Sequence, residues 1–324
     1  MTIRQRLAAL LALSAMAVLA PAMAADDTVA ARALKGDAVC TRCHDESEAK
    51  PVLSIYQTRH GVRADARTPT CQGCHGASEK HLTGDPNQKG RARPDIVYGK
   101  NAYKPNAAHE LAQTCLGCHS SGKRQHWSGS QHDNEDMACT NCHQIHTPND
   151  PVLDRVTQPD VCFKCHKEQR AQTHRYSTHP LDAGKMGCSD CHNPHGSTGP
   201  VLMNKNTVNE VCYTCHAEKR GPFLWEHQPV GDDCTNCHTP HGSNNQPLLK
   251  TRAPYLCQDC HVADHGRTLY SGANLPGGAG PTVAGTQNNP LLQSPNAQAN
   301  GRACLQCHSQ IHGSNHPAGA KFLR

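Results

Sequence analysis

The sequence predicts an elongated, mostly coil fold with short α-helices, little or no β-sheet, and a core that apolar side chains do not build. Of 324 residues, 20 are Cys and 24 are His, several times their usual share. Only 36% are hydrophobic, and that figure includes the 20 cysteines and 18 positions within residues 1–24. With 26 Gly and 22 Pro along the chain, we find no apolar run that would make a buried strand. This composition argues against doubly wound enzymes, β-sandwiches and helical bundles.

Residues 1–24 have the pattern of a secretory signal peptide. Arg4 and Arg6 precede an apolar run over 7–19, and Ala22, Met23 and Ala24 form a small-x-small cleavage site. The run is short for a membrane anchor, which is the alternative interpretation. We therefore expect an exported chain, residues 25–324, in a bacterial periplasm.

All cysteines fall into copies of one pentapeptide, C-x-x-C-H. The copies contain Cys40 and Cys43, Cys71 and Cys74, Cys115 and Cys118, Cys139 and Cys142, Cys162 and Cys165, Cys188 and Cys191, Cys212 and Cys215, Cys234 and Cys237, Cys257 and Cys260, and Cys304 and Cys307. Alternate copies resemble each other, because one of each pair continues as CHxxH. This periodicity predicts five two-motif repeats, at about 25–110, 111–158, 159–208, 209–253 and 254–324.

C-x-x-C-H is the attachment motif of c-type haem. Its two thiols form thioethers with the haem vinyl groups, and the adjacent imidazole binds iron. Redox disulfides and zinc ribbons do not require His after the second Cys, so ten covalently bound haems are predicted, and they supply the missing core of a multihaem cytochrome c. The proximal iron ligands are then His44, His75, His119, His143, His166, His192, His216, His238, His261 and His308.

The second axial ligand decides function, since iron with two strong ligands only passes electrons while an open position permits catalysis. Met is too scarce to serve ten sites, so His is expected. One series of candidates lies before the second motif of a repeat: His60, His132, His179 and His227. A second series lies after that motif: His81, His146, His195, His241 and His312. The tenth ligand is His265 or His316, and His109, His126 and His174 are interpreted as surface or propionate-binding residues.

Spacing also predicts ligation between repeats. His195 follows His192 by only three residues, so it cannot reach the opposite face of the same haem. We expect it, with His146 and His241, to serve a neighbouring haem. Ten haems on about 300 residues leave about 30 residues per haem, too few to insulate one haem from the next. The haems are thus predicted to lie within electron-tunnelling reach.

Several segments resemble the MtrA family of periplasmic decahaem cytochromes, which includes the MtoA, PioA and DmsE types. They are MGCSDCHNPHGS (186–197), VCYTCHAEKRGPFLWEH (211–227), CTNCHTPHGS (234–243), KTRAPYLCQDCH (250–261) and CLQCHSQIHGSNHP (304–317). The resemblance implies bis-His haems and a place inside an outer-membrane β-barrel porin. Electrons would pass between periplasmic or inner-membrane cytochromes and an external multihaem cytochrome, mineral or terminal reductase.

The predicted function is therefore an electron-transfer wire across the outer membrane for extracellular electron exchange, in iron or metal reduction or Fe(II) oxidation, and not an enzyme. One alternative is a soluble periplasmic electron shuttle or store. Another is a multihaem reductase with an open haem, which often carries a variant CxxCK motif that this sequence lacks. Nucleic acid is not an expected partner of an exported chain. This set of iron ligands does not indicate the direction of electron flow.

Overall fold

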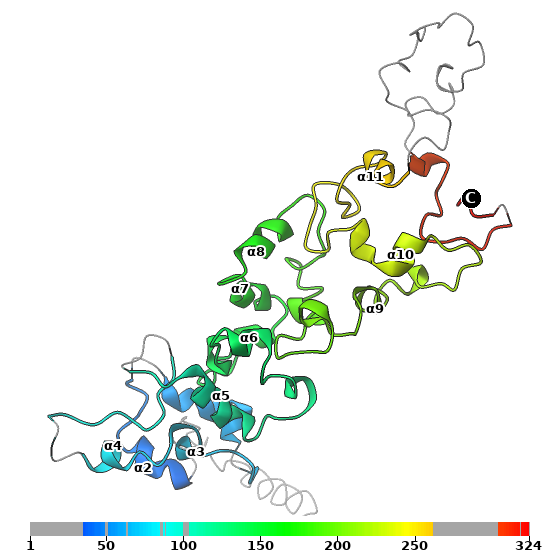
Figure 1. The fold of residues 1–324 in the computed structure, drawn as a ribbon. Coiled ribbons are helices and arrows are strands. Elements are labelled where there is room, and N and C mark those ends of the chain that lie inside the picture. The colour runs from blue at the N-terminus through cyan, green and yellow to red at the C-terminus, as the bar shows by residue number, and fades with distance from the viewer. Residues whose placement is uncertain are drawn as a thin grey trace, which may run out of the picture. The chain divides into compact units, whose positions relative to one another are not determined.

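The computed structural model describes residues 35–48, 51–62, 64–84, 87, 89–99, 104–261, 304–317 and 319–323 (Figure 1). The predicted signal peptide and His265 lie outside these ranges. The chain divides into two compact units: unit 1 is Met1–Asn106 with Gln144–Asn149, and unit 2 is Ala107–His143 with Asp150–Arg324.

The described residues are mostly coil with short helices, as predicted (Figure 1). The α-helices are α2 (Ala38–Thr41), α3 (Cys71–His75), α4 (Glu79–Thr83), α5 (Ala108–Leu116), α6 (Gln131–Asn134), α7 (Gln158–Cys162), α8 (Lys167–Thr173), α9 (Val208–Cys212), α10 (Gln228–Asp232) and α11 (Tyr255–Gln258). The 3-10 helices are η2 (Lys35–Asp37), η3 (Val52–Gln57), η4 (Arg59–Gly61), η5 (Gly122–Arg124), η6 (Cys139–Asn141), η7 (Pro151–Leu153), η8 (Cys188–Asp190), η9 (Pro200–Leu202), η10 (Ala217–Lys219), η11 (Cys234–Asn236) and η13 (Cys304–Gln306).

Sheet structure in these ranges is limited to isolated bridges, such as Ser177–Ser243 and Trp225–Ser314, so the expectation of little or no β-sheet is confirmed there. None of the helices described has the length and hydropathy of a membrane span. The same ranges bury only ten hydrophobic side chains, which is a small apolar core for a chain of this size.

Residues 208–219 form two short helices, α9 and η10. Thr207 caps α9 by accepting from the backbone N–H of Glu210 at 3.2 Å, a strong N-terminal signal. The helix stops at Cys212 because the motif forms its own turn, and His216 leaves the helical conformation at φ −103° and ψ 49°. The chain then resumes as η10.

The motif turn recurs along the chain. In nine motifs the carbonyl of the first Cys accepts from the N–H groups of the second Cys and of the His, at 2.8–3.3 Å. In α7 and α9 the first Cys is the last residue of the helix, whereas in η6, η8, η11 and η13 the first Cys begins a 3-10 turn. Two alternating local structures therefore accompany the two-motif periodicity of the sequence.

A buried carboxylate links the first two motifs within unit 1. Asp37, 2% exposed, accepts from the Tyr56 hydroxyl at 2.8 Å and from the backbone N–H of Cys71 at 2.7 Å. Burial, followed by the bond to Asp37, raises the pKa of Tyr56, so the phenol stays a donor. Asp37 thereby joins the segment that carries Cys40 to the start of α3.

We predict that Asp37→Ala destabilises unit 1. The substitution leaves the buried Tyr56 hydroxyl and the half-buried N–H of Cys71 without this acceptor, and loss of a buried donor's partner costs about 1–3 kcal/mol. Thermal denaturation and limited proteolysis of the holoprotein should show a lower Tm and earlier cleavage between residues 35 and 99. The control is Asp65→Ala, because Asp65 pairs with Arg67 in solvent, and this variant should melt like the native protein. Equal melting of the two variants would contradict the role of Asp37.

Candidate functional site

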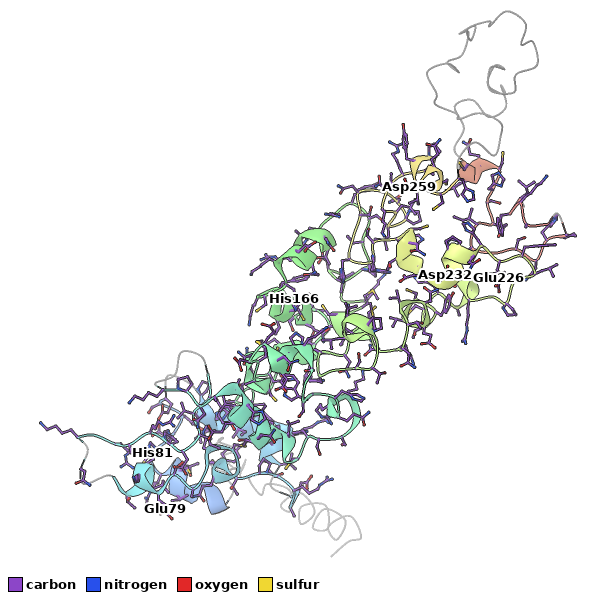
Figure 2. The ribbon with its side chains drawn as sticks, viewed as in Figure 1. Glu79, His81, His166, Glu226, Asp232 and Asp259 are labelled. Carbon is purple, nitrogen blue, oxygen red and sulfur yellow. The ribbon has the colours of Figure 1, made fainter. Side chains whose placement is uncertain are left out.

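Within the ranges that the structure describes, eight pairs of histidine rings lie close together, each joining one motif His with one of the candidate distal His. Ring centroids in these pairs lie 6.0–6.5 Å apart. The pairs are His44–His81, His75–His146, His143–His195, His132–His166, His179–His216, His192–His241, His227–His261 and His238–His312. Figure 2 labels one member of two pairs, His81 on α4 and His166 directly before α8.

This separation fits an iron ion between two imidazole nitrogens. A metal–imidazole bond is about 2.0–2.1 Å long, so two bonds in line span about 4 Å. Each nitrogen lies about 1 Å from its ring centre, which brings the expected separation of the two centres to about 6 Å. Direct ring packing does not require so uniform a gap. The pairs therefore have the spacing that haem with two axial His ligands needs.

The second nitrogen of most of these rings is hydrogen-bonded, which leaves Nε2 for the metal. Backbone carbonyls lie 2.6–3.0 Å from Nδ1 of seven paired rings: His75, His81, His132, His179, His192, His227 and His238. His44 and His143 instead bond to the carboxylates of Glu48 and Asp150, at 2.9 and 2.7 Å. An acceptor at Nδ1 fixes the tautomer and the orientation of a metal-binding imidazole.

Burial keeps several distal candidates neutral. It is the main cause that lowers the pKa of His146, His227, His241 and His312, and it lowers that of His195 to about 4. A neutral imidazole has a free lone pair, so protons compete little with a metal at these rings near neutral pH.

The pairs join different motifs within each unit. The structure places His195 opposite His143 rather than its sequence neighbour His192, and places His241 opposite His192. His146 lies in the same way opposite His75. Rings that follow a motif thus pair backward along the chain, an arrangement that ties consecutive repeats together.

Rings that precede a motif pair forward, and the next repeat holds them. His132 faces His166, and its Nδ1 is 2.8 Å from the carbonyl of Pro194, directly before the distal candidate His195. His179 and Pro240 repeat this contact at 2.8 Å. His227 and Ile311 repeat it at 3.0 Å. Each of these contacts joins one distal candidate ring to the backbone carbonyl of the residue directly before another distal candidate.

Thiols of neighbouring motifs also lie close together, alternately through their first and their second cysteines. The first cysteines of the two motifs in each predicted repeat lie close together: Cys40–Cys71, Cys115–Cys139, Cys162–Cys188, Cys212–Cys234 and Cys257–Cys304. Between repeats of unit 2 the second cysteines are neighbours: Cys142–Cys165, Cys191–Cys215 and Cys237–Cys260. All twenty cysteines lie in the described ranges and none forms a disulfide, so all remain available for thioethers.

Unpaired donors beside the His143–His195 pair also fit a haem. The buried atoms Arg124 Nε, Trp127 Nε1 and His195 Nδ1 have no hydrogen-bond partner. The Trp127 ring lies 6.3 Å from that of His195, and the Arg124 charge acts on His195. Buried donors are normally satisfied. A carboxylate such as a haem propionate is an acceptor that suits this set.

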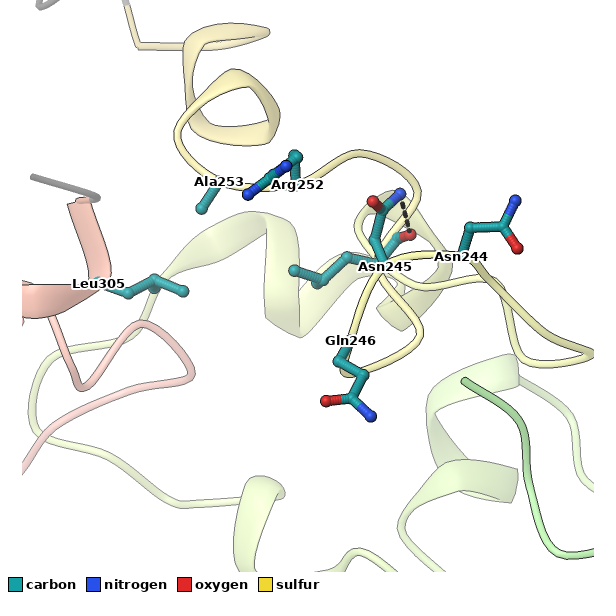
Figure 3. A pocket seen from close by; sticks show the side chains of 7 residues that line it. Asn244, Asn245, Gln246, Arg252, Ala253 and Leu305 are labelled. Carbon is teal, nitrogen blue, oxygen red and sulfur yellow. Dashed lines mark hydrogen bonds between the residues drawn. The ribbon is translucent and has the colours of Figure 1, made fainter. Parts of the chain in front are cut away.

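A cavity of about 370 Å³ lies beside the last motif (Figure 3). Leu305, within that motif, lines it together with Leu249, Ala253, Asn245 and Arg252. Asn245 is held by a bond to the carbonyl of Leu249 at 3.4 Å. The lining is mixed, with three apolar and four polar residues, and the Arg252 guanidinium among them suits a carboxylate.

All of these ligand assignments stay predictions, and five of the candidates lie outside the eight pairs. These are His60 and His316 as distal ligands, His119 and His308 as proximal ligands, and His265 outside the described residues. His308 has the backbone contact of the others, with Nδ1 2.5 Å from the carbonyl of Lys321. The side chain of His174 is 56% exposed, and His126 and His109 are exposed.

Ring orientation predicts two classes of EPR signal. Five pairs have planes within 26° of parallel, His179–His216 is tilted by 46°, and His132–His166 and His75–His146 are nearly perpendicular at 84° and 89°. Near-parallel ligand planes split the iron d orbitals and give rhombic low-spin spectra, whereas perpendicular planes give strongly anisotropic ones. The oxidised protein should therefore show both signals, with the rhombic class in the majority. A spectrum of one class alone would contradict these orientations.

Comparison with known proteins agrees with the motif content. The family model of the doubled CXXCH motif matches residues 132–171, 179–221 and 227–266. Each matched segment holds two motifs, the first pair being those that begin at Cys139 and Cys162. The chain is also 45% identical over 295 residues to the multiheme cytochrome MtrA of Shewanella baltica (strain OS185), an alignment that covers 90% of this chain and 82% of that relative.

Proposed function

Because this chain belongs to the MtrA family of multihaem c-type cytochromes, we propose that it is a decahaem electron wire that crosses the outer membrane inside a β-barrel porin. As a multihaem cytochrome it carries covalently bound haem c, and it is an electron-transfer protein rather than an enzyme. The proposed role is extracellular electron exchange, either in metal reduction or in Fe(II) oxidation.

The observation that carries the proposal is the interlocking series of His pairs. Eight pairs have the spacing of bis-His iron, and two strong axial ligands leave no position for a substrate. Within unit 2 the alternating thiol contacts place neighbouring attachment points side by side. Both features support electron hopping from haem to haem.

The proposed organisation is five two-haem repeats over 25–324, after a signal peptide over 1–24. The periplasm is the proposed location, in association with the outer membrane. The proposed partners are an outer-membrane porin, periplasmic or inner-membrane cytochromes, and an external multihaem cytochrome or terminal reductase. The support for these partners is family membership together with the export signal in the sequence.

Reconstitution tests the conduit. The holoprotein is co-expressed with an outer-membrane β-barrel porin of its own organism, the complex is purified in detergent, and it is placed in liposomes that enclose a reduced viologen dye. Addition of a ferric chelate outside should oxidise the dye inside, and liposomes with porin alone should retain reduced dye. A cytochrome that does not co-purify with the porin and gives no transmembrane oxidation would instead be a soluble shuttle.

A further inference from the structure

We propose that Asp150 lowers the reduction potential of the haem attached at Cys139 and Cys142, and so makes it a low-potential step among its neighbours in unit 2. The axial ligand of this haem, His143, places Nδ1 2.7 Å from Asp150 Oδ2. The two side chains are 26% and 11% exposed. The inference takes the bis-His assignment from the proposed function and adds a residue that tunes one site.

The later repeats provide an internal comparison. At the equivalent place His192 bonds to the backbone carbonyl of Val201 at 3.0 Å, and His238 to that of Pro247 at 2.9 Å. These acceptors are neutral. Asp150 is the seventh residue after His143, and the seventh residue after His192 is Gly199. The carboxylate is therefore a feature of this repeat and not of the motif.

Local structure holds the carboxylate in place. Asp150 lies directly before η7, and its Oδ1 accepts from the backbone N–H of Val152 at 3.4 Å. One oxygen thus faces the start of the 3-10 turn while the other faces the imidazole. An acidic residue held in this way stays beside the ligand without large rearrangement.

A carboxylate at Nδ1 draws the proton of that nitrogen and makes the imidazole a stronger donor to iron. A stronger donor favours Fe(III) over Fe(II), which lowers the potential. Low exposure limits solvent screening of this charge. Glu48 makes a similar contact with His44 at 2.9 Å, but these side chains are 42% and 38% exposed, so solvent weakens the effect there.

Positive charge lies on the other side of this ligand pair. The charges of Arg124 and Lys123 act on His195 and favour Fe(II). They are present whether or not Asp150 is changed, so substitution of Asp150 alone isolates its contribution. In the proposed step the haem attached at Cys139 and Cys142 accepts one electron from a neighbouring haem, and no atom is transferred.

The test is a potentiometric titration of the purified holoprotein, followed by EPR. Asp150→Asn removes the charge, and its single amide oxygen accepts from Nδ1 of His143 as the neutral carbonyls of the later repeats do, at the cost of the 3.4 Å contact with the Val152 N–H. One of the ten haems should titrate at a higher potential. Its EPR signal should belong to the near-parallel class, because the ring planes of His143 and His195 are 11° apart. Asp150→Glu, which retains a carboxylate, should keep that haem at low potential.

Glu48→Gln is the matched control and should shift its haem less. The inference is wrong if Asp150→Asn, with all ten haems present by mass spectrometry, titrates like the native protein, or if Glu48→Gln gives an equal or larger shift. The titration needs neither porin nor membrane. Failure of the conduit proposal in liposomes is therefore distinguishable from failure of this inference.

Discussion

His241→Ala is expected to convert one haem of ten from low spin to high spin. His241 is half-buried, and its ring centroid lies 6.1 Å from that of His192 with the planes 26° apart. Removal of the imidazole leaves that iron with one protein ligand, and alanine supplies no replacement. The ferric EPR spectrum should gain a high-spin signal of about one-tenth of total haem, and one rhombic signal should disappear.

The matched control is His174→Ala. His174 also belongs to the histidines outside the motifs, but its side chain is 56% exposed and its Nδ1 lies 4.0 Å from the Asp182 carboxylate. All ten haems of this variant should stay low spin. In liposomes that contain the porin complex, His241→Ala should also slow dye oxidation, because the altered haem interrupts the chain. A fully low-spin spectrum for His241→Ala would remove His241 from the ligand set.

Gly242→Ala is expected to displace the same ligand without touching it. Gly242 follows His241 with φ +149°, and a Cβ built there would lie 2.0 Å from the carbonyl oxygen of Gln172. No real Cβ tolerates such a contact with backbone, so the loop must move and take the His241 ring with it. Backbone strain alone costs about 1–3 kcal/mol. We expect a lower Tm together with a high-spin signal like that of His241→Ala.

Gly231→Ala is the control for this substitution. A Cβ on Gly231 meets nothing within 4 Å, and the residue lies inside α10. Alanine is favoured over glycine in a helix by about 1 kcal/mol, so this variant should melt at or slightly above the native Tm with all haems low spin. If Gly242→Ala matches it in both measurements, the tight contact with Gln172 does not position His241.

The motifs allowed the sequence to predict attachment and the general fold, because C-x-x-C-H determines its own chemistry and its own turn. The spacing of His195 after His192 also predicted that the two serve different haems, which is the arrangement in which the structure places their rings. These features depend on residues within a few positions of each other. Local sequence is sufficient for them.

The pairing itself could not be predicted. His238 faces His312 and His75 faces His146, and more than 70 residues separate the members of each pair. Nothing in the local pattern distinguishes one distal candidate from another at that range. In the structure one rule covers these pairs, since rings after a motif pair backward and rings before a motif pair forward.

The Nδ1 acceptors were also missed. Most are backbone carbonyls, such as those of Pro194, Pro240 and Ile311, and every residue type offers a carbonyl. Glu48 and Asp150 are the exceptions. Sequence could have revealed Asp150, because an acid seven residues after His143 stands where the next repeat has Gly199. A comparison of the repeats position by position would have found it.

Near-infrared magnetic circular dichroism of the oxidised protein decides whether every haem has two His ligands, because its charge-transfer bands identify the axial ligands of each low-spin ferric haem. We expect bis-His bands whose intensity corresponds to all ten haems attached to the 20 cysteines, with no high-spin contribution. One equivalent or more of high-spin haem, or of His–Met haem, would contradict it, because the chain would then contain an iron that is open or differently ligated.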